Sequence, residues 1–147
     1  MEKSLEDYLH KNIPISQAMG IKVVEALSQK VKLKAPFLNN INHKKTVFGG
    51  SLHAVATLAC WSILHLHLKD EKASYQIVIT KSEVDYLLPV DSDFTAECDM
   101  CKEASWQRFL KMLHAKGKAK IQLSAKIYQK DSLCVDYIGT FAALKLI

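Results

Sequence analysis

Two adjacent glycines, Gly49 and Gly50, stand at the start of a long segment without charged residues, and they are well suited to chemistry. If a helix begins there, the amides of its first turn have no helical partner and the helix dipole favours a negative charge beside them. Without a Cβ, a glycine also lets another group approach the backbone closely. The pair can therefore stabilise an oxyanion. On spacing alone, it can equally relieve crowding where the helix enters a sheet.

A polar cluster precedes the glycines and contains Asn39, Asn40, Asn42 and His43. Amide and imidazole groups can orient a carbonyl or a water molecule near the helix start. Asparagine-rich loops, however, usually form turns, so this cluster alone indicates little.

Three other patterns do not indicate catalysis or metal binding. Cys98 and Cys101 match CxxC, but residues three apart on a strand face opposite sides. His65 and His67 lie about 200° apart on a helix and cannot share a metal. Ser51, His53 and Asp85 are not a triad, because no GxSxG elbow surrounds a serine and Ser51 fits a helix start. We expect no metal and no cofactor.

The segment from Thr46 to Leu68 contains no Asp, Glu, Lys or Arg. It is long enough to span a bilayer, but its three histidines and other polar groups would be costly in lipid. We predict instead a helix from Gly49 or Gly50 to about Leu68, buried inside the protein, and no membrane partner.

The rest of the chain alternates in the manner of strands. Residues such as Val31, Leu33 and Ala35 alternate with lysines, which is typical of a half-exposed strand. Around the long helix we predict a short helix before Pro14, a small helix over 104–116, and strands near 21–37, 75–86, 93–100, 118–127 and 133–144. A curved antiparallel sheet wrapped around one apolar helix is an α+β architecture.

Composition limits the function classes. The 147 residues, 49% of them hydrophobic, predict a single globular domain over 1–147. The charged N-terminus and four cysteines that need no bridges favour a cytoplasmic protein. Arg108 is the only arginine among 20 basic residues, so nucleic-acid binding is not expected. The lysine excess either attracts an anionic small molecule or forms a solvated surface.

The stretch from Asn40 to Leu52, NINHKKTVFGGSL, resembles the entry to the central helix of hotdog-fold thioesterases. Its continuation over 56–61, ATLACW, resembles the branch known as the YiiD C-terminal type. Segments 13–20, 85–90, 108–110 and 116–119 agree, so the resemblance covers roughly residues 4–144. It implies a hotdog fold whose copies dimerise edge to edge, as a homodimer or tetramer, with the active sites at that interface. It also implies hydrolysis of acyl thioesters of coenzyme A or acyl carrier protein, without a cofactor.

The resemblance also implies roles for particular residues. Asn42 matches an asparagine that positions the thioester or water, and the N–H of Gly50 matches the donor that polarises the carbonyl. Phe48, Gly49, Ser51 and Tyr86 are then expected to contact substrate. Leu52 and Val55 are further apolar residues expected to line the acyl pocket, together with Phe48 and Tyr86.

Thr57 departs from the pattern, because a better-understood branch has a carboxylate there that activates water. A threonine hydroxyl is a poor base at neutral pH. Asp85, His43 or His53, from either protomer, is then a candidate base. The alternative function is a non-catalytic module that binds acyl-CoA or acyl carrier protein.

Overall fold

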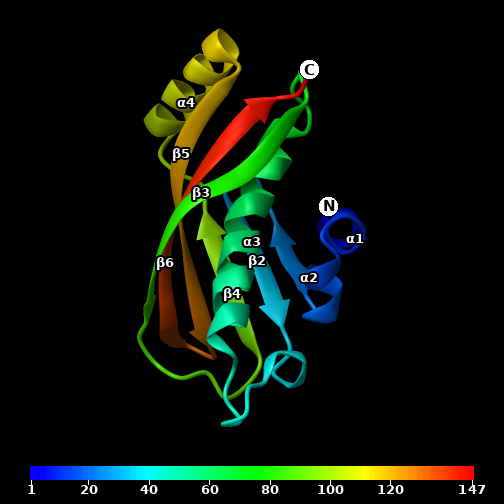
Figure 1. Cartoon of the computed structure of the whole chain (residues 1–147), viewed down its shortest axis with the longest axis vertical. Helices are drawn as coiled ribbons and strands as arrows, with labels where there is room; N and C mark the ends of the chain where they lie inside the picture. The colour runs from blue at the N-terminus through cyan, green and yellow to red at the C-terminus, as the bar shows by residue number, and fades with distance from the viewer.

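The computed structural model describes residues 1–147 and shows a long helix lying in the hollow of a curved antiparallel sheet (Figure 1). The elements in chain order are α1 (Glu2–Asn12), α2 (Pro14–Ala18), β1 (Lys22–Ala26), β2 (Lys30–Ala35), the 3₁₀ turn η1 (Leu38–Asn40), α3 (Gly49–Leu68), β3 (Tyr75–Tyr86), β4 (Phe94–Asp99), α4 (Glu103–Lys116), β5 (Lys118–Gln129) and β6 (Ser132–Lys145).

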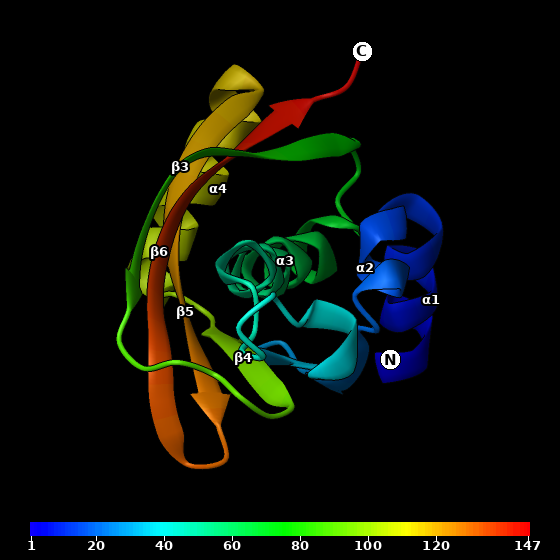
Figure 2. The same ribbon diagram turned by 60° about the horizontal axis from the view of Figure 1, so that its bottom comes forward.

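The uncharged segment forms α3, as predicted. Half of its 20 residues are buried, because the sheet curves around it and packs against it from β2, β3, β4, β5 and β6 (Figure 2). By length and composition, α3 is also the one helix that could cross a membrane. Its apolar surface is here covered by strands and belongs to a core of 36 buried residues.

The sheet has the order β1-β2-β4-β5-β6-β3, and every neighbouring pair is antiparallel. Alternate residues of each strand point toward α3, which is why Val31, Leu33 and Ala35 are fully buried while the lysines between them reach solvent. β3 forms one edge of the sheet and pairs only with β6, leaving the backbone groups of its outer side unpaired.

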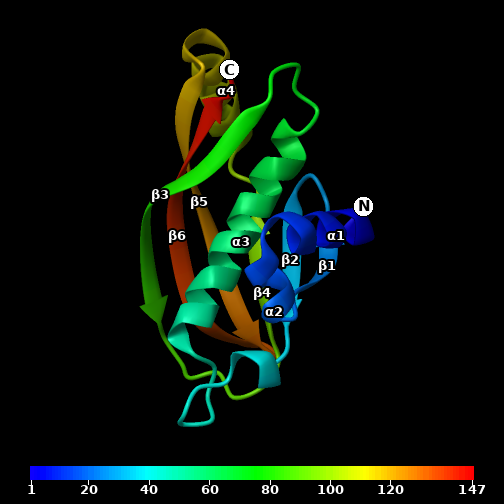
Figure 3. The same cartoon turned by 45° about the vertical axis from the view of Figure 1, so that its right-hand side comes forward.

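The N-terminal helices lie beside α3 at the opposite edge from β3 (Figure 3). Leu5 and Leu9 of α1 are buried. Pro14 ends α1 and occupies the first turn of α2, where its missing N–H costs nothing. The two helices therefore form one wall of a groove along α3.

Helix α4 packs against β5 and ends at Gly117, whose φ of 73° is the left-handed conformation that glycine adopts at the end of a helix. Cys98 is buried on β4, whereas Cys101 lies beyond the end of that strand and is partly exposed, so, contrary to expectation, the two are not on one strand. Burial next to Cys98 raises the pKa of the Cys60 thiol well above its ordinary value, and all four cysteines are free.

Candidate functional site

One stripe of α3 carries the residues that can act on a substrate. Gly50, His53, Thr57 and Trp61 follow one another at helical spacings of three or four residues, so they share one face. Two helical turns separate Gly50 from Thr57, about 10 Å along the axis. His53 lies between them. The helix thus lines up a backbone donor, an imidazole and a hydroxyl.

The Thr57 hydroxyl makes two hydrogen bonds within the chain. It donates its proton to the carbonyl oxygen of His53 at 2.9 Å, so the hydroxyl of Tyr137, 2.8 Å away, donates to it. A hydroxyl has two acceptor lone pairs, and this arrangement leaves one of them free. Thr57 can therefore hold a water molecule by accepting a bond from it, but its own proton is committed.

Tyr137, on β6, fixes that hydroxyl from the sheet side. Its ring is fully buried, and burial raises the pKa of the phenol to about 12, so it stays a donor at neutral pH. The ring lies over Gly139, where a Cβ would come within 2.8 Å of the Tyr137 hydroxyl oxygen. The glycine leaves the space that the hydroxyl needs to reach Thr57. Tyr137 was not predicted from the sequence. The signal that could have indicated it is Gly139, a glycine on the same strand face two residues after the aromatic residue.

His53 reaches the edge strand. Its Nε2 lies 2.9 Å from Oγ of Ser82 on β3, and its ring meets that of Tyr137 edge to face at 5.5 Å between centroids. Ser82 was also missed from the sequence. Its signal is a polar residue at an inward position of β3, where the face toward α3 is otherwise apolar.

An open pocket of about 250 Å³ lies on this stripe. His53 and Thr57 supply its polar groups, while α3 and the α1–α2 segment supply apolar walls. The lining residues are Ile13, Ile15, Met19, His53, Ala54, Thr57, Leu58 and Trp61. Such a pocket can accept an apolar chain whose polar end lies at His53 and Thr57.

The glycine pair begins α3, as predicted. The first helical amides with acceptors are those of Ser51 and Leu52, which donate to the carbonyl of Phe48, while the N–H groups of Gly49 and Gly50 have no acceptor in the chain. The exposed Phe48 ring packs on Gly50 and leaves no room there for a side chain. Because it has no acceptor in the chain, the amide of Gly50 can donate to an incoming carbonyl oxygen.

Tyr86 and Gly49 lie together at this end of the helix. The Tyr86 hydroxyl is 3.4 Å from the Gly49 carbonyl, and both residues line a second hollow of about 290 Å³ with Leu52. Val55 is fully buried in the core and lines neither this hollow nor the pocket beside Thr57. The expectation that Val55 lines the acyl pocket is wrong, because its side of the helix faces the sheet.

Asn42 stabilises its own loop. Its Oδ1 accepts the backbone N–H groups of Lys44 and Thr46 at 2.8 and 3.1 Å, and its Nδ2 donates to the Thr46 hydroxyl at 2.9 Å. Lys45, with φ of 61°, completes the turn. His43 is exposed beside it. Within one chain, the structure does not bring Asn42 or His43 to Thr57.

Asp85 lies on the opposite face of β3 from Ser82. Alternation places Ser82 and Tyr86 toward α3, and Tyr86 indeed contacts Gly49. Asp85 therefore points outward and is exposed. The structure does not bring it to His53 or Thr57 in the same chain.

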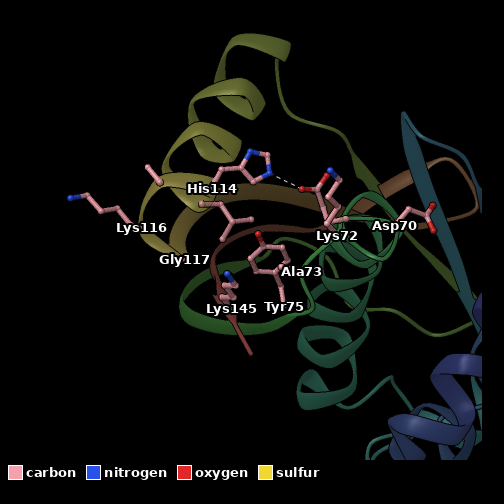
Figure 4. Close-up of a pocket in the computed structure, with 11 residues that line it drawn as sticks. Asp70, Lys72, Ala73, Tyr75, His114, Lys116, Gly117 and Lys145 are labelled. Atoms are coloured by element: carbon pink, nitrogen blue, oxygen red, sulfur yellow. Dashed lines mark hydrogen bonds and ion pairs between the residues drawn. The ribbon is translucent and has the colours of Figure 1, made fainter. Parts of the chain in front are cut away.

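The largest hollow, about 750 Å³, lies at the other end of α3, between α4 and the start of β3 (Figure 4). Lys72, Lys116 and Lys145 line it, and His114 bonds Glu71 at 2.6 Å across it. Lys126, on β5, does not line this hollow and forms an ion pair with Asp136 at 3.1 Å. Nowhere do three His, Cys, Asp or Glu side chains gather as a metal site.

Known proteins share this architecture. A model of the family described as "Putative thioesterase (yiiD_Cterm)" matches residues 2–145. A Chlorobaculum tepidum protein of unknown function is 32% identical, with a TM-score of 0.92 over 99% of this chain and 94% of that one. The fold also matches a protein named a putative thioesterase from Shewanella oneidensis (24% identical, TM-score 0.81, 97% and 96% covered) and a thioesterase from Haemophilus influenzae (15%, 0.78, 100% and 92%).

The predicted α+β hotdog architecture is confirmed, and the family match places the chain in the thioesterase class of enzymes. The chain belongs to the YiiD C-terminal thioesterase family.

Proposed function

We propose that this protein hydrolyses acyl thioesters of coenzyme A or acyl carrier protein, using its own side chains and water. The observation that carries the proposal is that one face of α3 presents the free amides of Gly49 and Gly50 and, about 10 Å further along the axis, the Thr57 hydroxyl in an apolar pocket. The acyl chain occupies the pocket. The thioester carbonyl accepts from the Gly50 amide, and Thr57 holds the attacking water.

The proposed enzyme is a homodimer or tetramer. The unpaired outer side of β3 supports this assembly, because an exposed edge strand is otherwise a site of unwanted pairing. Edge-to-edge pairing would bring a second copy beside Ser82 and the helix stripe. Residues of the Asn42 loop, which do not reach Thr57 in their own chain, would then have a route to the site from the other copy.

The test is hydrolysis of a panel of acyl-CoA and acyl-carrier-protein thioesters that differ in chain length, with release of the free thiol measured for wild type and Thr57→Val. We expect turnover that depends on chain length. We expect Thr57→Val to lower kcat/KM about five- to tenfold, since one hydrogen bond to the water contributes about 1–1.5 kcal/mol. Asp85→Asn, on the outer face, is the control and retains activity.

The alternative is a module that binds acyl thioesters without hydrolysing them, which Thr57 in place of a carboxylate favours. Saturable binding measured by calorimetry, with no thiol released from any thioester, would show that the protein is a binding module and not an enzyme. Absence of both binding and turnover would contradict both functions.

A further inference from the structure

The stripe on α3 lacks one component of a hydrolase, a group that accepts the proton of water. The Thr57 hydroxyl cannot do so, because its proton is donated to the His53 carbonyl and the hydroxyl itself acts as an acceptor. Among the residues that line the pocket, His53 is the only ionisable one. An imidazole, with an ordinary pKa near 6.5, is suited to proton transfer at neutral pH.

The His53 ring is held on two sides. Ser82 of β3 meets Nε2 at 2.9 Å, and the Tyr137 ring packs against it edge to face. In the tautomer that carries its proton on Nε2, that nitrogen donates to Ser82 Oγ and Nδ1 keeps its lone pair. The Ser82 contact therefore fixes the orientation of the ring, and the proposed base is the tautomer in which Nε2 donates to Ser82 and Nδ1 accepts a proton.

The other nitrogen, Nδ1, is free and accessible. It makes no hydrogen bond within the chain. It is also absent from the buried polar atoms that lack a partner, which are Ser16 Oγ, Asn40 Oδ1 and Ser62 Oγ. An unpartnered nitrogen that is not buried is open to water.

His53 also occupies the right place along the helix. It lies one turn before Thr57, and side chains four apart on a helix are about 5–6 Å apart at Cβ. One water molecule can therefore donate one proton to Thr57 Oγ and the other to His53 Nδ1. Gly50, one turn earlier on the same face, presents its free amide to the carbonyl that this water attacks.

We propose that His53 is the general base of the hydrolysis and that Ser82 is its positioning residue, an inference that rests on the proposed thioesterase function. The water oxygen forms a bond to the thioester carbonyl carbon while Nδ1 takes the water proton. The resulting oxyanion accepts from the Gly50 amide. The carbon–sulfur bond then breaks, and the imidazolium returns the proton to the departing thiolate, giving a carboxylic acid and a free thiol.

Few charges surround His53. From β3 it faces Ser82, from β6 the protonated Tyr137, and from α3 Thr57, while the α1–α2 side contributes the apolar Ile13, Ile15 and Met19. Lys81 and Glu83 flank Ser82 but point to the other face of β3 and pair with each other at 3.6 Å. We therefore expect the pH dependence of hydrolysis to change when His53 is replaced.

The experiment measures kcat and KM between pH 5 and 9 for wild type, His53→Gln, Ser82→Ala and Ser82→Thr, on the best acyl thioester of the panel. We expect His53→Gln to lower kcat at least 100-fold and to abolish the acidic limb of the pH profile. Ser82→Ala should lower kcat about tenfold and shift that limb, and Ser82→Thr, which keeps a hydroxyl, should restore both. His67→Gln, the same change on the same helix at a histidine bonded to the Ser28 carbonyl, is the matched control and retains wild-type kinetics.

Circular dichroism and binding of the acyl thioester establish that His53→Gln is folded; if it is not, His53→Asn takes its place. An active wild type together with a folded His53 variant that keeps more than a third of the wild-type kcat would overturn the role of His53 and leave the thioesterase intact. Mass spectrometry of the wild type during turnover provides a second test, because an acyl group attached to Ser82 would make Ser82 a nucleophile and overturn the proposal. A wild type that hydrolyses no thioester overturns both proposals.

Discussion

The Thr57 hydroxyl shows how a single residue acquires a role from its neighbours. The Thr57 hydroxyl donates a hydrogen bond to the His53 carbonyl and accepts one from Tyr137. One lone pair of its oxygen therefore remains free to accept a hydrogen bond from a water molecule. The raised pKa of Tyr137 keeps this polarity fixed at neutral pH. Thr57 could be singled out from the sequence through its position seven residues after Gly50. Its partners could not, because Tyr137 and Ser82 come from strands that follow much later in the chain.

The Gly139→Ala substitution adds a single methyl group next to Tyr137 and so tests whether the Tyr137 hydroxyl positions Thr57. A Cβ at position 139 would lie within 3 Å of both the Tyr137 hydroxyl and the Phe141 ring, so the tyrosine must move and its bond to Thr57 is lost. We expect the variant to be destabilised by about 1–3 kcal/mol in urea unfolding. We also expect it to lose activity to the same extent as Tyr137→Phe, which removes the hydroxyl itself. Ser124→Ala, on the exposed side of β5, should change neither property. Wild-type activity in Gly139→Ala would show that the Tyr137 hydroxyl does not position Thr57.

Among the elements, α3 was predictable and β3 only in part. The absence of charge over 46–68 indicated a helix buried on most sides, and the structure packs it against five strands while leaving one stripe partly exposed beside the pocket. Alternation located β3, but its neighbour could not be inferred, because alternation describes faces and not sheet order. The face on which Asp85 lies depends on how β3 sits against α3, which the sequence does not give. Asp85 was therefore a candidate base from the sequence, whereas the structure places it on the outer face of β3.

The unpaired edge of β3 leads to a prediction about assembly. If two copies join at this edge, light scattering gives twice the 16.6 kDa chain mass or a higher multiple, and the outer amides of residues 75–86 exchange slowly with deuterium. On dilution below the dissociation constant, this strand should lose protection before β5, whose two neighbours lie in the same chain. A monomeric mass, or β3 amides that exchange rapidly at every concentration, would contradict the edge-to-edge dimer.

The whole molecule carries a formal charge of +5 and has a lysine-lined hollow away from the Thr57 pocket. Composition shows the excess of lysine but not where the lysines lie. Only the fold shows that Lys126 is paired with Asp136, while Lys72, Lys116 and Lys145 line one hollow. A positive surface raises the local concentration of an anionic substrate, and salt screens that attraction over about 8–10 Å.

The salt dependence of kcat/KM can therefore distinguish attraction of the charged carrier from binding of the acyl chain. We expect kcat/KM for an acyl-CoA to fall several-fold between 20 and 500 mM salt, as screened long-range attraction predicts. The same acyl group on the uncharged N-acetylcysteamine should show little change. The Lys116→Gln, Lys145→Gln double variant should weaken the salt dependence for acyl-CoA alone. Equal salt sensitivity of the two substrates would assign the effect to the reaction site and not to the charged carrier.

The aromatic residues along the groove have a further use. Trp61 lines the pocket beside Thr57 and stacks on His65 with a centroid distance of 5.1 Å, and His65 in turn stacks on Tyr8 of α1 at 4.3 Å. The other tryptophan, Trp106, is buried on α4 between Phe109 and His67, away from the residues that line the pocket. With Trp106 replaced by phenylalanine, the remaining indole becomes a spectroscopic label already in place at the pocket, so occupancy can be followed by its fluorescence without attaching a dye.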